Sequence, residues 1–186
     1  MRISGGESKG RSIKPPAHKG LRPTSDKVRE ALFSILADSV PEASFLELFA
    51  GTGAVGIEAL SRGAARAVFV DLSVKASRLI RENLDTTGYR ERAAVVTKDV
   101  PAFLKNDATV MGPFDIVFLD PPYHEEAGPK ALAFLGEDAA DGFLAEGSLV
   151  VYEYFKKHQT PGEVGRLVKK KDYFYGDTAV SVYIKK

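Results

Sequence analysis

Hydrophobic and polar positions along this chain predict a regular succession of strands and helices. Between residues 44 and 155, short continuous apolar runs such as "SFLELFA" (44–50) and "FDIVFLD" (114–120) alternate with stretches of helical periodicity. Continuous apolar strands joined by helices are typical of a mostly parallel sheet that is covered on both faces. The pattern therefore predicts an α/β fold.

Residues that begin and end helices support this assignment. Thr24 or Ser25 can cap a helix over "TSDKVREALFSILADS", because their side-chain oxygens accept from backbone N–H groups. Ser73 is placed to cap a second helix, which Gly88 ends, and Gly63 ends a third. Glycine is common at this point because it adopts the left-handed conformation that closes a helix.

The two ends of the chain lie outside the alternation. "MRISGG" and "GRSIKPP" predict two short strands around a glycine turn, so residues 1–22 are expected to form a basic hairpin arm and residues 23–186 the main domain. The ending "RLVKKKDYFYGDTAVSVYIKK" predicts a closing hairpin that turns at Gly176 and Asp177.

Composition and charge narrow the class of protein. The chain has 186 residues, 44% of them hydrophobic, and no cysteine, and no run approaches the roughly 20 apolar residues of a membrane span. A cytoplasmic protein without membrane contact is expected, with a monomer as the default. The net charge of +1 combines +5 in residues 1–31, −8 in 32–150 and +4 in 151–186. Basic ends of this kind favour a polyanionic partner.

A glycine-rich loop follows the first predicted core strand. Gly51 to Gly56 read G-T-G-A-V-G, and Asp71 ends the next strand 20 residues after Gly51. Such glycines allow a ligand close to the backbone, and the acid can accept the hydroxyls of a ribose. NAD and S-adenosylmethionine both fit. Glu47, just before the glycines, favours a cationic group over a pyrophosphate.

Two further acids end predicted strands. Asp99 closes "VVTKD" and could accept from an adenine amino group, although it could equally cap the following helix. Asp120 closes "FDIVFLD". Ligands of open α/β sheets bind at the carboxyl ends of the strands, where Glu47, Asp71, Asp99 and Asp120 are all expected.

The stretch "DPPY" continues from Asp120. Pro121 and Pro122 offer carbonyl acceptors and no N–H donor. The Asp120 carboxylate and the Pro121 carbonyl could together hold an amine with two hydrogens and direct its lone pair at an electrophile. Tyr123 could stack on a planar base, at about 1–3 kcal/mol.

These motifs resemble the class I S-adenosylmethionine-dependent amino-methyltransferases. The segments "GLRPTSDKVREALFSIL" and "FLELFAGTGAVGIEALSRGA" are similar, more particularly, to the RsmD family of bacterial 16S rRNA guanine-N2 methyltransferases. The resemblance covers essentially the whole chain. It implies a Rossmann-like, seven-stranded sheet with helices on both faces and an antiparallel last strand.

The resemblance also implies roles for individual residues. Methyl transfer from S-adenosylmethionine to the N2 amine of a guanine would use Asp120, Pro121, Pro122 and Tyr123. The cofactor would be bound by the glycine loop and the strand ends, with Asp120 adjoining it; these positions are Glu47, Phe49, Ala50, Gly51, Thr52, Gly53, Asp71, Leu72, Asp99 and Val100. The reaction needs no metal, and none is expected.

The expected partner is 16S rRNA or an assembly intermediate of the small ribosomal subunit. Basic residues of the arm would contact phosphates, and the target base would be flipped out of its helix. Candidates for contact with the RNA or with the methionine end of the cofactor are Arg2, Lys9, Arg11, Lys14, Arg22, Thr24 and Arg29. Arg29 could equally form a salt bridge on a helix surface.

Four other functions compete with this interpretation. A DNA adenine-N6 methyltransferase would use the same corner, but the chain has no room for a separate domain that reads duplex sequence. Protein glutamine methyltransferases typically carry Asn at the position of Asp120. An NAD-dependent oxidoreductase leaves "DPPY" unexplained. A non-catalytic RNA-binding module would tolerate Asp120→Ala.

Overall fold

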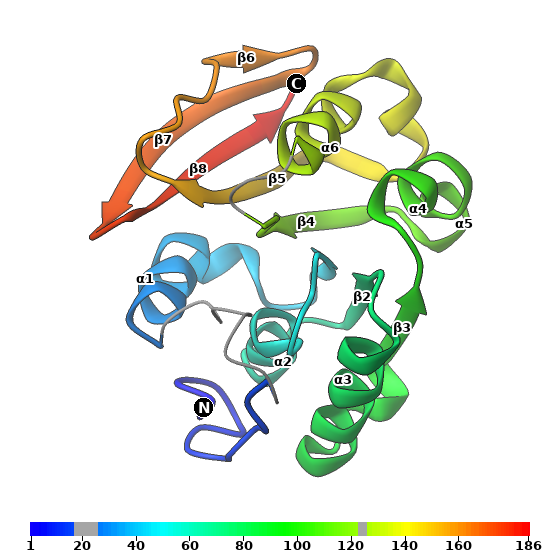
Figure 1. Ribbon diagram of the computed structural model, residues 1–186, viewed down its shortest axis with the longest axis vertical. Coiled ribbons are helices and arrows are strands. Elements are labelled where there is room, and N and C mark those ends of the chain that lie inside the picture. Colours follow the sequence, from blue (N-terminus) through cyan, green and yellow to red (C-terminus); the bar gives the residue numbers. More distant parts are fainter. Residues whose placement is uncertain (17–25, 123–125) are drawn as a thin grey trace. The chain divides into compact units, whose positions relative to one another are not determined.

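The computed structural model describes residues 1–16, 26–122 and 126–186. Its contacts divide the chain into two compact units, Met1–Lys98 and Asp99–Lys186. Both units combine strands with helices (Figure 1), which is the α/β class that the sequence predicts. No helix in the described part of the chain is long and apolar enough to cross a membrane.

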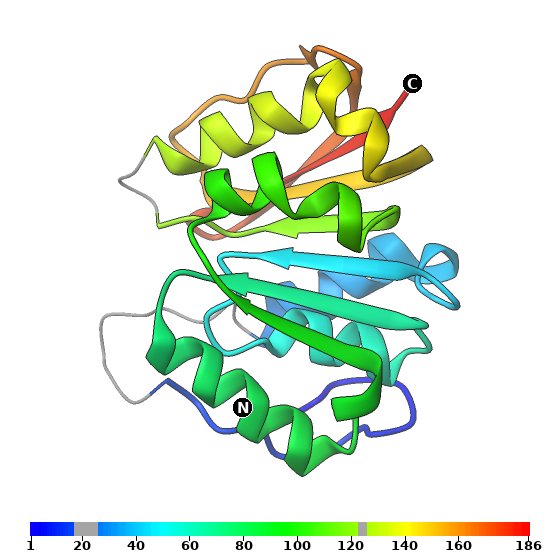
Figure 2. The same cartoon turned by 90° about the vertical axis from the view of Figure 1, so that its right-hand side faces the viewer.

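The first unit is built on three parallel strands in the order β3-β2-β1. Its elements are α1 (Asp26–Leu36), η1 (Ala37–Ser39), β1 (Ser44–Leu48), α2 (Ala54–Ser61), β2 (Arg66–Asp71), α3 (Val74–Thr87), η2 (Arg90–Arg92) and β3 (Ala93–Thr97). Every residue of β1 is buried, as expected of a strand covered on both faces. Helix α3 runs beside β3 (Figures 1 and 2).

The predicted limits of α3 are confirmed. The Ser73 hydroxyl accepts from the Ala76 N–H at 3.3 Å, and Gly88 ends the helix with φ 81°. Gly63, with φ 99°, follows the end of α2, also as predicted. The cap expected from Thr24 or Ser25 lies outside the described residues.

The N-terminal segment packs within the first unit. Its predicted pairing is present in short form: Arg2 and Ser12 form an antiparallel bridge, and the Ile3 N–H donates to the Arg11 carbonyl at 3.0 Å. Residues 1–16 contain no longer strand.

Side chains also hold the segment. Ile3 and Ile13 are buried, and the Tyr89 hydroxyl donates to Ser8 Oγ at 2.6 Å. Residues 1–16 therefore pack against the rest of this unit, and the boundary of the arm at residue 22 stays a prediction.

The second unit has a mixed sheet in the order β4-β5-β8-β7-β6. Its elements are α4 (Val100–Asn106), α5 (Ala108–Met111), β4 (Phe114–Leu119), α6 (Ala127–Gly136), η3 (Asp138–Gly142), β5 (Leu144–Phe155), β6 (Glu163–Val164), β7 (Leu167–Tyr175) and β8 (Thr178–Lys185). Strands β4 and β5 are parallel, whereas β8 is antiparallel to both β5 and β7.

The antiparallel last strand and the closing hairpin are confirmed, and Gly176 makes the turn with φ 61°. The expected strand number is wrong, since the described residues contain eight strands rather than seven. The two-residue strand β6 pairs with the start of β7, and so short an element leaves almost no hydrophobic pattern in the sequence.

Candidate active site

The loop between β1 and α2 has an unusual backbone. Phe49, Gly51 and Gly53 all have positive φ, at 59°, 53° and 73°. For Phe49 this left-handed conformation costs about 1–2 kcal/mol. Strain of this kind persists where the surrounding structure imposes it, and it is concentrated at ligand sites. The backbone thus independently marks the loop that the sequence singles out.

The two glycines of this loop meet different constraints. A Cβ on Gly53 would lie 3.1 Å from Ile80 and 3.2 Å from Phe69, so a larger residue would be crowded there as well as strained by the positive φ. A Cβ on Gly51 would have only the Phe49 carbonyl within 4 Å among the described residues. Gly51 therefore borders open space, as a ligand-binding position would. Asn83 fixes the loop by donating to the Thr52 carbonyl at 3.1 Å.

Asp71 stands at the end of β2 with an oriented carboxylate. The Gly51 N–H donates to Oδ2 and the Ser73 N–H to Oδ1, both at 2.8 Å. A carboxylate has about four acceptor positions, so two remain for further donors. The vicinal hydroxyls of a ribose are two such donors. Asp71 is thus tied to the glycine loop itself, which the spacing of 20 residues alone could not show.

Glu47 is buried, at 3% exposure, and its Oε2 accepts from the Gly56 N–H at 2.8 Å. Gly56 lies in the first turn of α2, where a carboxylate is favoured by the helix dipole. A Cβ on Gly56 would meet this oxygen at 2.8 Å. The structure thus gives Glu47 a role in holding α2 against β1, and its contact with a cationic ligand group stays a prediction.

The remaining cofactor candidates differ in exposure. Leu72 is 69% exposed although apolar, which suits a residue that a flat base covers. Asp99 occupies the N-cap position of α4, but its side chain makes no capping hydrogen bond, so the alternative of a helix cap is not supported. The Val100 side chain is buried. Any contact of Val100 with a ligand would use its backbone N–H in the first turn of α4, where N–H groups lack intrahelical partners.

The proline corner follows β4 in the second unit. Asp120 is partly buried, Pro121 is buried and Pro122 is exposed. The Pro121 carbonyl and the Asp120 carboxylate are acceptors, and neither proline has an N–H. Tyr123 lies outside the described residues, so its stacking role stays a prediction.

Two residues behind this corner were not found from the sequence. A Cβ on Gly128 of α6 would lie 2.5 Å from Pro121 Cγ and 2.6 Å from the Tyr152 hydroxyl. Tyr152 pairs with Leu119 across the parallel strands β4 and β5. Burial, together with Tyr183, Tyr154 and the Asp120 charge, raises the pKa of Tyr152 to about 12. The register that brings Tyr152 beside Asp120 is not readable from either strand alone.

Arg29 forms salt bridges, as one of the two expectations had it, but inside the unit. Its side chain is 0% exposed, so it does not lie on the helix surface, and its contact with a ligand stays a prediction. Its Nε donates to Glu58 Oε2 at 3.1 Å and its Nη2 to Asp26 at 2.9 Å, and Nη2 also donates to the Arg2 carbonyl. Arg29 thus joins α1, α2 and the N-terminal segment. Its Nη1 has no hydrogen-bond partner among the described residues.

Two of the four described residues that were predicted to contact RNA from the N-terminal segment bind other parts of the protein. Lys14 forms an ion pair with Glu82 at 2.8 Å, and Arg11 Nη1 donates to the Thr87 carbonyl at 3.0 Å. Arg2 and Lys9 are exposed. Arg22 and Thr24 lie outside the described residues.

Comparison with known proteins shows the family of the chain. The family model for conserved hypothetical protein 95 matches residues 1–184. YlbH of Bacillus subtilis is 37% identical over 186 residues, all of both chains. The ribosomal RNA small subunit methyltransferase D of Escherichia coli K12 is 39% identical over 153 residues, 82% of this chain and 74% of that protein.

Solved structures confirm the fold. The yhhF protein of Escherichia coli superposes with a TM-score of 0.84 and 33% identity, covering 100% of this chain and 98% of that one. An RNA methyltransferase from Salinibacter ruber, solved with S-adenosyl-L-homocysteine, has a TM-score of 0.67 at 18% identity, over 88% of this chain and 94% of that one.

The fold is the Rossmann-like fold of a class I S-adenosylmethionine-dependent methyltransferase, and S-adenosylmethionine is the cofactor. The oriented carboxylate of Asp71, the open side of Gly51 and the exposed Leu72 fit an adenosine. The chain belongs to the conserved hypothetical protein 95 family, the family of the small subunit methyltransferase D.

Proposed function

We propose that this protein methylates the exocyclic N2 amine of a guanine in 16S rRNA, acting on the small ribosomal subunit or its assembly intermediates in the cytoplasm. The full-length similarity to a family that includes ribosomal RNA small subunit methyltransferase D supports the RNA substrate. The observation that carries the chemistry is the corner Asp120-Pro121-Pro122, which offers acceptors and no donors. Such a corner suits an amine that presents two hydrogens.

In this proposal the glycine loop and the acids Asp71 and Asp99 bind the cofactor, and the proline corner holds the amine. Asp71 accepts the ribose hydroxyls, while Gly51 and Gly53 let the backbone approach the ligand. Asp99 accepts from the adenine amino group, and Leu72 covers the base. Because the Gly51 and Ser73 N–H groups already orient Asp71, little side-chain freedom is lost on binding.

The amine is held by the Asp120 carboxylate and the Pro121 carbonyl. Accepting both hydrogens withdraws the nitrogen lone pair from conjugation and directs it toward the methyl group. The cofactor supplies that methyl on a sulfonium. As the N–C bond forms and the S–C bond breaks, positive charge develops on nitrogen, which Asp120 stabilises until a proton leaves. Fixed charges of this kind contribute strongly to catalysis because they need no reorganisation.

A DNA adenine-N6 methyltransferase remains the alternative, since an adenine amine also carries two hydrogens. Protein glutamine methylation is less favoured because position 120 is Asp. The discriminating experiment offers labelled S-adenosylmethionine with three acceptors: small subunits from a strain lacking the family enzyme, protein-free 16S RNA, and duplex DNA. We expect label in RNA, released as N2-methylguanine. Label as N6-methyladenine in DNA, or none in RNA, would contradict the proposal.

A further inference from the structure

The side-chain amide of Asn83 joins the N-terminal segment to the glycine loop. Asn83 belongs to α3, beside which the segment lies (Figure 2), and its side chain is 0% exposed. Its Oδ1 accepts from the Lys14 N–H at 2.8 Å. Its Nδ2 donates to the carbonyls of Lys14 at 3.3 Å and of Thr52 at 3.1 Å. One buried side chain thus binds the backbone of two segments that lie far apart in the sequence.

These three bonds use both hydrogens of the amide. An asparagine side chain has two N–H donors on its nitrogen, and the two acceptors of Nδ2 are the carbonyls of Lys14 and Thr52. The partners also fix the orientation of the amide, because the Lys14 N–H needs the oxygen and the two carbonyls need the nitrogen. A shift of either segment therefore moves a group to which the other segment is bound.

On the side of the glycine loop, the peptide between Thr52 and Gly53 is held at both ends. Its carbonyl accepts from Asn83 at 3.1 Å, and its N–H donates to the Ala50 carbonyl at 2.7 Å. Glycine has more backbone freedom than any other residue. A loop that contains both Gly51 and Gly53 therefore depends on such bonds for a fixed shape.

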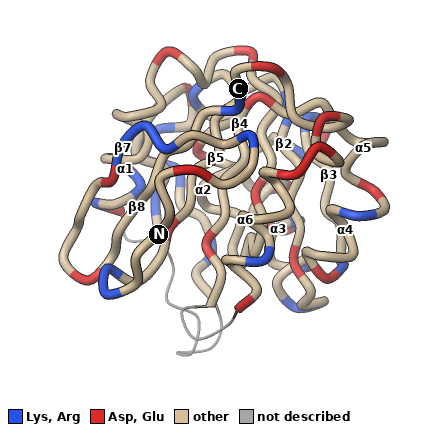
Figure 3. The backbone as a smooth tube through the Cα atoms, turned by 90° about the horizontal axis from the view of Figure 1, so that it is seen from above, with Lys and Arg blue, Asp and Glu red and all other residues tan. Residues whose placement is uncertain are grey.

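On the side of the N-terminal segment, Asn83 is the stronger of two attachments of Lys14 to α3. The other is the ion pair of Lys14 with Glu82, whose side chains are 62% and 44% exposed. Helix α3 carries charges of both signs (Figure 3). Exposed ion pairs contribute little to stability because water and salt screen them, whereas the amide of Asn83 is shielded from both.

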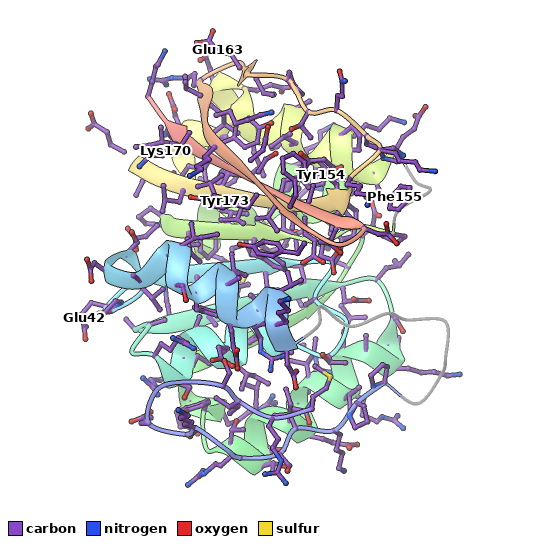
Figure 4. All side chains as sticks on the ribbon, turned by 90° about the vertical axis from the view of Figure 1, so that its left-hand side faces the viewer. Glu42, Tyr154, Phe155, Glu163, Lys170 and Tyr173 are labelled. Carbon is purple, nitrogen blue, oxygen red and sulfur yellow. The ribbon has the colours of Figure 1, made fainter. Side chains whose placement is uncertain are left out.

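A buried asparagine has a simpler explanation, because the backbone of a packed segment needs hydrogen-bond partners. The segment lies along the helices of its unit (Figure 4), and Tyr89 fastens it in this simpler way, through a bond of 2.6 Å to Ser8 Oγ. Asn83 differs from such a fastener because it also binds the Thr52 carbonyl. That bond extends the attachment to the loop where the cofactor is expected.

We infer that Asn83 is a positioning residue that links cofactor binding to the placement of the N-terminal segment. A cofactor that fixes the glycine loop keeps the Thr52 carbonyl in place for Asn83, and Asn83 in turn holds Lys14. Coupling between two ligands is reciprocal, so RNA bound by the segment favours the cofactor to the same extent that the cofactor favours RNA. The RNA part of this inference rests on the proposed function, whereas the link between loop and segment does not.

The first test follows amide hydrogen exchange of the full chain by NMR, with and without saturating S-adenosyl-L-homocysteine. The reporter is the Ile13 N–H, which donates to the Met1 carbonyl at 3.0 Å and so keeps its acceptor in Asn83→Ala. Tyr89→Phe, which removes the other attachment of the segment, is one control. Thr87→Ala is the second, because it removes a buried hydroxyl of α3 that donates to carbonyls of its own helix.

We expect Asn83→Ala to raise the Kd for S-adenosyl-L-homocysteine about tenfold. Because coupling is reciprocal, the saturating ligand should slow exchange at Ile13 in wild type by a similar factor. The slowing should disappear in Asn83→Ala and persist in both controls, whose Kd should match that of wild type. Slowing that survives in Asn83→Ala would overturn the inference. If that variant does not fold, wild type decides, since exchange at Ile13 that the ligand leaves unchanged also overturns it.

The second test measures the Kd for S-adenosyl-L-homocysteine with and without saturating 16S RNA. RNA should lower this Kd about fivefold in wild type, at the low end of the usual range for coupled sites, and leave it unchanged in Asn83→Ala. An equal effect of RNA on both proteins would overturn the role of Asn83 toward RNA. Failure of the proposed function gives a different result: ligand-dependent exchange at Ile13 without methyl transfer to RNA supports the link and overturns the proposed function alone.

Discussion

Two acids that follow parallel strands have opposite surroundings. Asp71 ends β2 and accepts N–H donors from Gly51 and Ser73, whereas Asp120 follows β4 and precedes two prolines without donors. The first carboxylate is oriented by the protein and has acceptor capacity left for hydroxyls. The second stands where the following backbone offers only acceptors. The same side chain at the same kind of position can therefore bind a cofactor or act on an amine.

The largest effect should follow from Asp120→Ala. We expect the methyl-transfer kcat to fall about 10²–10³-fold, the range seen when one preorganised electrostatic group is removed, with the Kd for S-adenosylmethionine little changed. Calorimetry and a labelled-methyl assay measure the two quantities. Asp138→Ala, at an exposed position of the same unit, is the control. An unchanged kcat would favour the non-catalytic RNA-binding function.

Asp71→Ala should show the opposite pattern. Loss of hydrogen bonds to a charged group costs about 1.5–3 kcal/mol, so cofactor Kd should rise about 10–100-fold, partly because the Gly51 N–H also loses its acceptor. The control Asp85→Ala removes an exposed acid of α3. Unchanged cofactor affinity in Asp71→Ala would contradict the proposal that Asp71 binds the ribose hydroxyls.

Gly128→Ala tests whether the packing of α6 against Pro121 fixes the proline corner. The added Cβ would lie 2.5 Å from Pro121 Cγ, so the proline, the helix or both must move. A misplacement of about 1 Å can cost 10²-fold in rate; we expect kcat to fall about tenfold, with cofactor Kd unchanged. Gly162→Ala, whose Cβ meets nothing within 4 Å among the described residues, should match wild type. Equal rates for both variants would contradict the tight packing.

Gly51→Ala and Gly88→Ala separate strain from ligand contact. Both glycines have positive φ, and neither has a close protein neighbour in the described chain that a Cβ would strike. Each change should cost about 1–2 kcal/mol of unfolding free energy, measured by urea denaturation. Only Gly51→Ala should also weaken cofactor binding. Similar affinities for the two variants would mean that the cofactor does not approach Gly51.

The smallest effect concerns pH. The pKa of Tyr152 is raised from 10.0 to about 12, so the folded chain retains this proton at a pH where the unfolded chain loses it. Its contribution to stability is complete below pH 10 and is lost as the pH rises toward 12. Tyr152→Phe should make the fall in unfolding free energy shallower over this window. If the unfolding free energy of wild type and of Tyr152→Phe fell equally steeply between pH 10 and 12, ionisation of Tyr152 would not contribute to the pH dependence of stability.

The candidate site residues that could be selected from the sequence are those that stand out by their neighbours along the chain. Glycine spacing, strand-ending acids and two consecutive prolines are contiguous features whose chemistry does not depend on distant partners. Parallel strands buried on both faces, such as β1, also leave a plain hydrophobic pattern.

Features that depend on tertiary contacts could not be predicted. Arg29 has the spacing of a helix-surface residue, but Glu58, 29 positions away, draws it into the interior. The N-terminal segment reads as two strands, but the pairing is limited to one bridge between Arg2 and Ser12, and contacts to Ser61 and Tyr89 fix where the segment packs. Tyr152 and Gly128 meet Pro121 only through register and helix packing.

The most direct test of this division of roles is single-turnover methyl transfer to 16S RNA at saturating S-adenosylmethionine, measured for wild type, Asp71→Ala and Asp120→Ala. If Asp71 serves binding and Asp120 serves the chemical step, saturation should restore the Asp71→Ala rate to near that of wild type and leave Asp120→Ala about 10²–10³-fold slower. Recovery of Asp120→Ala at high cofactor, or no recovery of Asp71→Ala, would contradict the account.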